Sequence, residues 1–330
     1  MSRLRDAFGR AIDEIRISLT DRCNFRCVYC MPTGGLPGLP RGEILTFEEI
    51  LRLARMFIGL GIRTIRLTGG EPLLRQDIAD LVAGVARLKP DLDLSLTTNG
   101  ALLGVKAFGL AQAGLKRVNV SLDTLQPVRF QRLTRCDGRF LSRVLEGLAA
   151  ARAVGLRPTK VNCVLIRGCN DDEAVDFARF GREHDYQVRF IEYMPLDAQG
   201  DWRMSAVVPA AEILARIERV FPLAESLNNG GGPARVYRFT DGRGSIGVIP
   251  SVTRPFCSTC NRIRLTSDGR LRTCVFSNRE YNLKRLLRSG ASDDQLIDTV
   301  VAAVRGKEAG HKVNQPGFIR PTVSMSTLGG

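Results

Sequence analysis

The 330-residue chain has no long hydrophobic run, only two histidines and a single tryptophan. Its apolar stretches fall well short of the roughly 18 residues that a membrane-spanning helix requires, which argues against a membrane protein. No apolar segment follows the basic residues near the N-terminus, so there is no secretory signal and we expect a cytoplasmic protein. A hydrophobic fraction of 44% and a charged fraction of 25% argue against a disordered or fibrous chain.

Acidic residues are in the minority, and the formal net charge is +14. Arginine supplies 41 of the 48 basic residues, an excess that GC-rich codons explain in large part. The alternative explanation is an anionic partner, nucleic acid or a polyphosphate ligand, because a guanidinium matches phosphate groups. No five basic residues occur in a row, which weakens the nucleic-acid interpretation.

Cysteine is unusually frequent, with nine residues, most of them clustered. An odd number of clustered thiols in a cytosolic chain indicates metal or redox chemistry before disulfides.

Strand-like and helix-like patterns alternate through the first 200 residues. Strands are expected at residues 14–20, 64–68, 92–97, 117–122, 160–166 and 188–193. Helices are expected at 46–59, 77–88, 105–113, 141–154 and 172–184. This alternation predicts an α/β fold with a parallel sheet, and six units predict an open, partial barrel with its ligand site at the carboxyl ends of the strands.

The pattern changes after residue 200, so we expect two regions, 1–200 and 201–330. The second reads as an α+β region with a helix at 209–220, a flexible loop at 228–233 and strands at 235–239 and 245–249. A hairpin is expected at 262–272, helical structure beyond 282 and a loose tail at 325–330.

Three cysteines follow the first expected strand in the spacing CxxxCxxC, at Cys23, Cys27 and Cys30. Three thiolates can hold three irons of a [4Fe-4S] cluster and leave the fourth iron open for catalysis. The alternative is a structural zinc site, which requires a fourth ligand. Neither His184 nor His311 lies nearby in the sequence.

The motif, with Tyr29 before its last cysteine, resembles the signature of the radical S-adenosylmethionine (SAM) enzymes. This resemblance implies a partial (β/α)6 barrel, in agreement with the six units predicted above. It also implies that the open iron chelates SAM, and that one electron from the cluster then releases a 5′-deoxyadenosyl radical.

Further positions match that family. The segment 68–72, TGGEP, resembles its GGEP motif, where glycines let the backbone approach the methionine amino group. Each match alone is more often an ordinary turn or core residue. The SAM-binding residues that the resemblance implies are Tyr29, Gly70, Ser121 and Met194.

A second cysteine group consists of Cys257 and Cys260, spaced CxxC, and Cys274 across the expected hairpin. A zinc ribbon is the alternative, but it lacks a fourth cysteine, so three ligands again suggest a [4Fe-4S] cluster with one open iron. The other cysteines have no metal spacing and are expected to be ordinary buried thiols: Cys136, Cys163 and Cys169.

The two cysteine groups, with segments such as RLTGGEPLLR and CSTCNRIRLTSDGRLRTC, closely resemble the GTP 3′,8-cyclases of molybdenum cofactor biosynthesis over essentially the whole chain. The resemblance implies that GTP binds between the two clusters. The implied GTP-binding residues are Arg16, Arg66, Thr97, Lys160, Arg262, Ile263 and Arg264, with Arg189 as a weaker candidate.

Physical chemistry agrees with several of these positions. Arginine forks neutralise a triphosphate well, and Arg262 and Arg264 alternate on a strand, so both project to one face. One position departs from the pattern. Some relatives carry a lysine where this chain has Thr64, so one triphosphate contact is missing or replaced.

The implied reaction converts GTP to (8S)-3′,8-cyclo-7,8-dihydroguanosine 5′-triphosphate, with SAM cleaved to 5′-deoxyadenosine and methionine. The implied partners are a one-electron reductase and cyclic pyranopterin monophosphate synthase, which takes the product onward, and the chain is expected to be a monomer or homodimer. The tail residues Gly329 and Gly330 resemble the family segment that reaches into the active site, although a frayed terminus is the plainer interpretation.

Two other functions compete with this one. A radical SAM maturase with an auxiliary cluster usually carries more cysteines in its C-terminal region than the three present here. A zinc-stabilised nucleic-acid-binding module fits the positive charge, but not the barrel alternation or the lack of a basic cluster and an aromatic platform.

Overall fold

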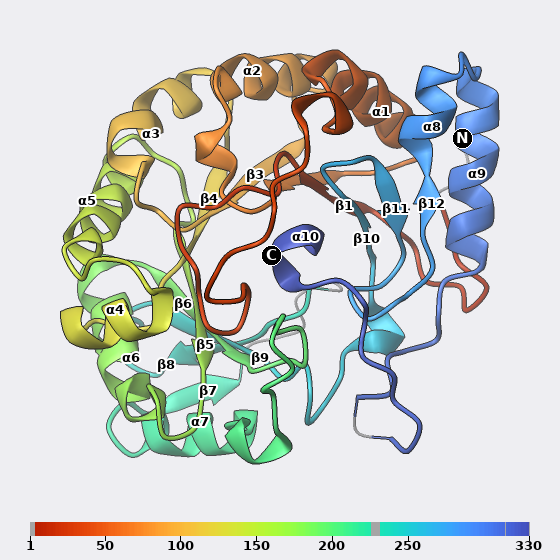
Figure 1. Cartoon of the computed structure of the whole chain (residues 1–330). Coiled ribbons are helices and arrows are strands. Elements are labelled where there is room, and N and C mark those ends of the chain that lie inside the picture. Colours follow the sequence, from red (N-terminus) through yellow and green to blue (C-terminus); the bar gives the residue numbers. More distant parts are fainter. Residues whose placement is uncertain (1–3, 226–231, 314, 330) are drawn as a thin grey trace.

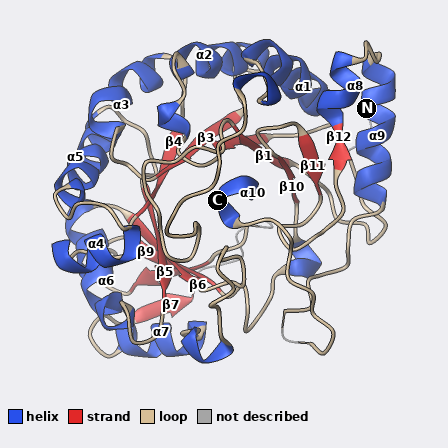
Figure 2. Ribbon diagram, viewed as in Figure 1, coloured by secondary structure: helices blue, strands red, loops and turns tan. Residues whose placement is uncertain are grey.

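The computed structural model describes residues 4–225, 232–313 and 315–329. In this part of the chain, twelve strands form one curved sheet in the order β12-β11-β10-β1-β2-β3-β4-β5-β6-β9-β8-β7 (Figures 1 and 2). The strands are β1 Glu14–Ser18, β2 Thr64–Thr68, β3 Asp93–Thr98, β4 Arg117–Ser121, β5 Lys160–Leu165, β6 Gln187–Glu192, β7 Leu223–Glu225, β8 Arg235–Phe239, β9 Ser245–Ile249, β10 Arg262–Leu265, β11 Arg270–Arg272 and β12 Tyr281–Asn282.

Strands β1 to β6 are parallel neighbours in chain order, as the alternation predicted. Helices lie along the outside of the arc of strands (Figure 1). The α-helices are α1 Phe47–Gly59, α2 Ile78–Leu88, α3 Leu103–Gln112, α4 Pro127–Thr134, α5 Phe140–Ala153, α6 Ala174–His184, α7 Ala210–Glu218, α8 Leu283–Arg288, α9 Asp293–Arg305 and α10 Met325–Leu328. Short 3-10 turns are η1 Arg41–Glu43, η2 Pro72–Leu74, η3 Asp171–Glu173, η4 Met204–Ala206 and η5 Cys257–Thr259.

The C-terminal region joins this sheet instead of forming a separate one. β10 adds to β1 and β9 adds to β6, both in parallel, so both edges of the six-stranded barrel are covered. Pairing of this kind satisfies edge groups that would otherwise face solvent or another chain. The hairpin expected at 262–272 is confirmed as β10 and β11. A boundary near residue 200 stays a prediction.

Strand alternation separates a polar inner face from an apolar outer face. On β1, Ile15 and Ile17 are fully buried among the core residues beneath the helices. Glu14, Arg16 and Ser18 point the other way, toward the barrel axis, and are also buried. The barrel is therefore stabilised by the layer between strands and helices, and its interior remains polar.

Some local expectations are confirmed in the structure and others are not. α1 begins at the expected capping box, formed by Thr46 and Glu49. Helix α4 and the short strands β7 and β12 were not expected from the sequence. The expected loop at 228–233 falls mostly on residues outside the described part of the chain. Within the described residues, no helix is long and apolar enough to cross a membrane.

The C-terminal tail is not loose as far as residue 329. α10 lies inside the arc of strands (Figure 1), and Leu328 is fully buried in a small cluster that includes Leu196 and Val252. Gly329 lies against Ser18, whose hydroxyl donates to the carbonyl oxygen of Leu328 at 3.4 Å. The expectation of a loose tail is wrong for these residues, because burial of Leu328 and hydrogen bonds to the tail backbone hold them in the barrel.

Replacing Leu328 with alanine should release the tail. Truncating a buried leucine costs about 2–5 kcal/mol, and here the loss falls on a single short turn. The Gly329 amide, which donates to the Met325 carbonyl at 2.9 Å, should then exchange its hydrogen much faster in mass-spectrometric exchange measurements. Thr327→Ala, at a half-buried neighbouring position, is the control. Equal protection in both variants would contradict the docking role of Leu328.

Candidate active site

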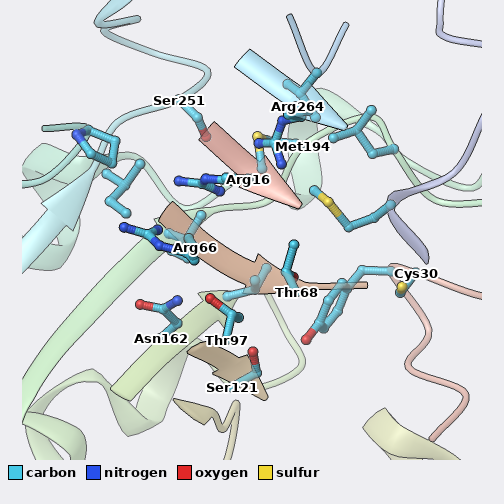
Figure 3. Close-up of a pocket in the computed structure, with 18 of the residues that line it drawn as sticks. Arg16, Cys30, Arg66, Thr68, Thr97, Ser121, Asn162, Met194, Ser251 and Arg264 are labelled. Carbon is cyan, nitrogen blue, oxygen red and sulfur yellow. The ribbon is translucent and has the colours of Figure 1, made fainter. Parts of the chain in front are cut away.

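A cavity of about 260 Å³ lies within the barrel. All six cysteines of the two motifs line it, together with inward-facing residues of the strands and Met325 of the tail. The structure therefore brings together two groups that lie more than 220 positions apart in the sequence, from Cys30 to Cys257. Figure 3 shows Arg16, Arg66, Thr97 and Asn162 around this cavity, with Cys30 at its other side.

The CxxxCxxC loop follows β1 and holds its cysteines in a half-buried position. Cys30 donates its amide to the Cys27 carbonyl at 2.9 Å, and the Cys23 sulfur accepts from the Phe25 amide at 3.4 Å. Burial raises the pKa of Cys23 to about 11 and that of Cys30 to about 12, and raises the pKa of Cys27 well above its usual value. Without a metal, these thiols therefore keep their protons, and iron binding must displace them.

Tyr29 is fixed by a carboxylate from another strand end. Its hydroxyl donates to Asp123 Oδ2 at 2.6 Å, while Asp123 Oδ1 accepts from the Val164 amide at 2.8 Å. Burial raises the pKa of Asp123 to about 6. Asp123 thus ties the cysteine loop to the ends of β4 and β5, a role that sequence analysis did not assign to it.

The GGEP segment packs directly against the cysteine loop. A Cβ atom on Gly70 would lie 2.2 Å from the Arg22 carbonyl oxygen, and one on Gly69 would lie 2.5 Å from that of Thr20. Only glycine tolerates such contacts, and Gly69 also has a φ of 141°. The two glycines therefore allow the GGEP segment to lie in close contact with the backbone of the loop that follows β1. Gly70 lines the cavity as well, as the SAM assignment requires.

Glu71 links the GGEP segment to the end of β3 through hydrogen bonds. Its carboxylate is fully buried and accepts from the Thr98 hydroxyl and from the amides of Leu73 and Asn99, at 2.7–2.9 Å. Burial raises its pKa to about 7 despite these bonds.

The second cysteine group has a different electrostatic environment. Burial acts to raise the pKa of Cys260, but the nearby charges of Lys307, Arg262 and Arg10 outweigh it and lower the pKa. Burial raises the pKa of Cys274. Arg10 also donates to the Cys257 carbonyl at 2.6 Å. Sequence analysis missed Arg10 and Lys307, because both lie far from the cysteines in the chain.

Each cysteine group supplies three thiols to the cavity. Tetrahedral structural zinc requires four ligands around one centre. Three thiols suit a cluster in which each thiolate ligates a different iron. The three-thiol donor set of each group is thus compatible with a [4Fe-4S] cluster.

Glu14 is surrounded by guanidinium groups on the inner face of the barrel. Its Oε1 lies 3.1 Å from Arg16 Nε and 3.4 Å from Arg66 Nη2. Burial acts to raise the pKa of Glu14, but the charges of Arg66, Arg262 and Arg16 hold it well below its usual value. Burial in turn lowers the pKa of Arg66 to about 9. One carboxylate cannot neutralise these cations, so the cavity has an affinity for anions.

Two arginines of strand β10 face the first cavity, and the residue between them faces the core. Arg262 and Arg264 line the cavity, whereas Ile263 is fully buried on the opposite face among the core residues. The side chain of Ile263 therefore does not face this cavity, so a contact of Ile263 with GTP would have to come from its backbone, and the assignment stays a prediction. Arg264 Nη1 donates to the Gly329 carbonyl at 2.5 Å, so the tail reaches this wall. Gly330 lies outside the described residues.

Several buried polar atoms in the barrel have no hydrogen-bond partner. They are Arg66 Nε, Ser95 Oγ, Asn119 Oδ1 and Asn162 Oδ1. Buried polar groups in proteins are normally satisfied, so the two exceptions that line the first cavity, on Arg66 and Asn162, are typical of a ligand site. Asn162 lines the cavity together with Thr97, Ser121 and Met194. Sequence analysis missed it, although it alternates with Lys160 on β5.

Lys160 lines a second cavity, of about 460 Å³, where the strands begin. This cavity shares Arg66, Arg189 and Pro233 with the first, so the two adjoin. Burial lowers the pKa of Lys160 to about 6, with further contributions from Arg189, Arg117 and Arg66. Of the residues expected to bind GTP, Lys160 and Ile263 are those that do not line the first cavity.

Comparisons with known proteins agree with this site. The family model of the radical SAM superfamily matches residues 17–181, and that of Molybdenum Cofactor Synthesis C matches residues 186–313. The chain is 49% identical to the GTP 3′,8-cyclase of Streptomyces coelicolor, over 99% of this chain and 96% of that protein. It is 47% identical to GTP 3′,8-cyclase 2 of Mycobacterium tuberculosis, over 99% and 92%.

Among solved structures, Streptococcus suis SuiB aligns with a TM-score of 0.62 over 96% of this chain and 78% of that chain. At 15% identity this likeness shows the shared fold alone. The two family models together cover both cysteine groups, and the sequence identity extends over nearly the whole length. The chain therefore belongs to the GTP 3′,8-cyclase family of radical SAM enzymes.

Proposed function

We propose that the chain is a radical SAM GTP 3′,8-cyclase, which catalyses the first step of molybdenum cofactor biosynthesis. It converts GTP to (8S)-3′,8-cyclo-7,8-dihydroguanosine 5′-triphosphate, with SAM cleaved to 5′-deoxyadenosine and methionine. The observation that carries the proposal is a single cavity lined by two cysteine triads and by arginines that one carboxylate only partly neutralises. Relatives with the same activity in their names support it.

The cysteines are the proposed cluster ligands. Cys23, Cys27 and Cys30 would hold the [4Fe-4S] cluster of the radical SAM fold, which when bound supplies the electron that cleaves SAM. Tyr29, Gly70, Ser121 and Met194 all line the same cavity and are the proposed SAM contacts. The second cluster, on Cys257, Cys260 and Cys274, is supported by the three-ligand donor set and by the cations beside Cys260.

The chain itself binds and orients the nucleotide. Arg262 and Arg264 stand beside the second cysteine group and suit the guanine end, while Arg16, Thr97 and Arg66 line the space between the groups. Arg66, Arg189 and Lys160 lead into the second cavity, where the triphosphate would lie. Burial in the barrel excludes water, which protects radical chemistry from side reactions.

The tail and the external partners complete the proposal. Gly329, held by Arg264, is placed to border the bound nucleotide, and Gly330 would extend the tail further. A one-electron reductase would supply the electron, and cyclic pyranopterin monophosphate synthase would take the product onward. The chain would act as a monomer or homodimer.

The proposal is tested by anaerobic reconstitution with iron and sulfide, followed by incubation with SAM, dithionite and GTP. Two four-iron clusters predict about eight irons per chain. Mass spectrometry should detect 5′-deoxyadenosine and the cyclised nucleotide, both dependent on GTP. Cys274→Ala should lose the second cluster and the cyclised product, whereas Cys169→Ala, outside both motifs, should retain both. Two clusters without a product from GTP would contradict the cyclase assignment.

Lys160 should make GTP binding dependent on pH. Its pKa is lowered to about 6 in the free protein, and a bound triphosphate should raise it again, so binding takes up a proton above pH 6. The contribution of Lys160 to affinity is fully present below pH 6 and declines as the pH rises. Calorimetry at pH 7.5 in buffers of different ionisation enthalpy should measure this uptake.

Lys160→Met should remove that proton uptake and weaken GTP binding. Lys116→Met, at an exposed position, is the matched control and should leave both unchanged. Equal proton uptake in the wild type and in Lys160→Met would refute the assignment of the proton to Lys160.

A further inference from the structure

The second cavity receives one basic side chain from outside the parallel barrel. Besides Arg66, Arg117, Lys160 and Arg189, its lining includes Arg238 of β8. β8 is antiparallel to β9, which in turn extends β6, so Arg238 reaches the cavity from the added edge of the sheet. Neither motif nor resemblance pointed to this residue.

The register of β8 directs Arg238 toward the cavity. Arg238 is paired with Ser245, whose hydroxyl accepts from Gln187 Nε2 at 3.1 Å, and both of these residues also line the cavity. Val236, two residues earlier, lines it as well, as strand alternation requires. Arg235 belongs to the opposite set of positions, is exposed, and does not line the cavity.

Three of the other four cations of this cavity, the arginines, already have partners, and the fourth, Lys160, is buried. Arg117 Nε donates to Asp93 Oδ1 at 2.7 Å, and the Thr64 hydroxyl lies 3.4 Å from the same carboxylate. The wall at Thr64 therefore carries no net positive charge. Arg66 lies near Glu14, and Arg189 donates to Gln187 at 3.1 Å.

Arg238 differs from these residues. Within the described part of the chain it has no ion pair and no side-chain hydrogen bond, and it is exposed at the rim of the cavity. Its guanidinium can therefore bind an anion without first breaking an internal contact. Arginine is suited to this role because its planar fork binds phosphate oxygens in pairs.

We propose that Arg238 binds the terminal phosphate of the nucleotide and makes the site prefer a triphosphate to a diphosphate. The inference rests on the proposed function, in which the base lies in the first cavity. The shared residues Arg66 and Arg189 then meet the phosphates nearest the ribose, and Lys160 follows. The last phosphate, which carries the most charge, reaches the rim of the second cavity. There Arg238 supplies a positive charge that the side of the cavity at Thr64 lacks.

The test compares the affinities for GTP and GDP within each variant. Calorimetry on the reconstituted protein, with both clusters and without reductant, should show that wild type binds GTP more tightly than GDP. Arg238→Ala should raise the Kd for GTP about tenfold, the usual cost of a lost charge-assisted contact, and change the Kd for GDP less than about twofold. Arg238→Lys should fall between the two, because it keeps the charge but loses the fork.

Arg235→Ala is the matched control, since it removes an exposed arginine from the other face of the same strand. It should leave both affinities unchanged. An equal loss of GTP and GDP binding in Arg238→Ala, no loss at all, or the same loss in Arg235→Ala would overturn the inference. The GTP-to-GDP ratio is measured within one protein sample, so a merely structural defect would not alter it.

The same preparations separate this inference from the proposed function. If wild type forms no cyclised product from GTP, the proposed function fails. If wild type forms the product but Arg238→Ala retains the wild-type GTP-to-GDP ratio, only the role of Arg238 fails.

Discussion

The buried carboxylate of Glu14 is the interaction on which the barrel interior depends. It lies at the start of β1, within ion-pair distance of Arg16 and Arg66, and its pKa is held well below the usual value. Without it, several guanidinium groups would repel one another in a space with little water. With it, the cluster is only partly neutralised. An anionic ligand can neutralise the remaining positive charge. The stability of the barrel interior and the binding of an anion therefore both depend on Glu14.

The two cysteine groups face the same cavity but differ electrostatically at Cys260. The cysteines of the CxxxCxxC loop are half-buried, and desolvation raises their pKa values. In the second group, Lys307, Arg262 and Arg10 lower the pKa of Cys260 and favour its thiolate. Cys260 therefore depends less than the CxxxCxxC thiols on metal charge to become deprotonated, whereas burial raises the pKa of Cys274. The Gly69-Gly70 pair lets the GGEP segment approach the loop closely enough to hold it.

Much of the site followed from the sequence, because its residues are local to strand ends. The first cysteine loop, the GGEP glycines, Ser121 and Met194 each follow a strand whose pattern was clear, and all of them line one cavity. The contacts that were missed join residues far apart in the chain. Asp123 orients Tyr29 across 94 positions, and Arg10 reaches the Cys257 carbonyl across 247. No periodicity within a single element indicates such a contact.

The sequence by itself determined the six βα units and their order, because apolar alternation and helix caps are local properties of the chain. It also determined the cysteine spacing and, through alternation on β10, the common face of Arg262 and Arg264. Only the tertiary structure decided that β9 and β10 close the two edges of the barrel. It also decided that the tail docks through Leu328 and that Arg238 reaches the second cavity. These outcomes depend on which distant strands pair and in which register, and pairing energy is shared between segments rather than encoded in either one.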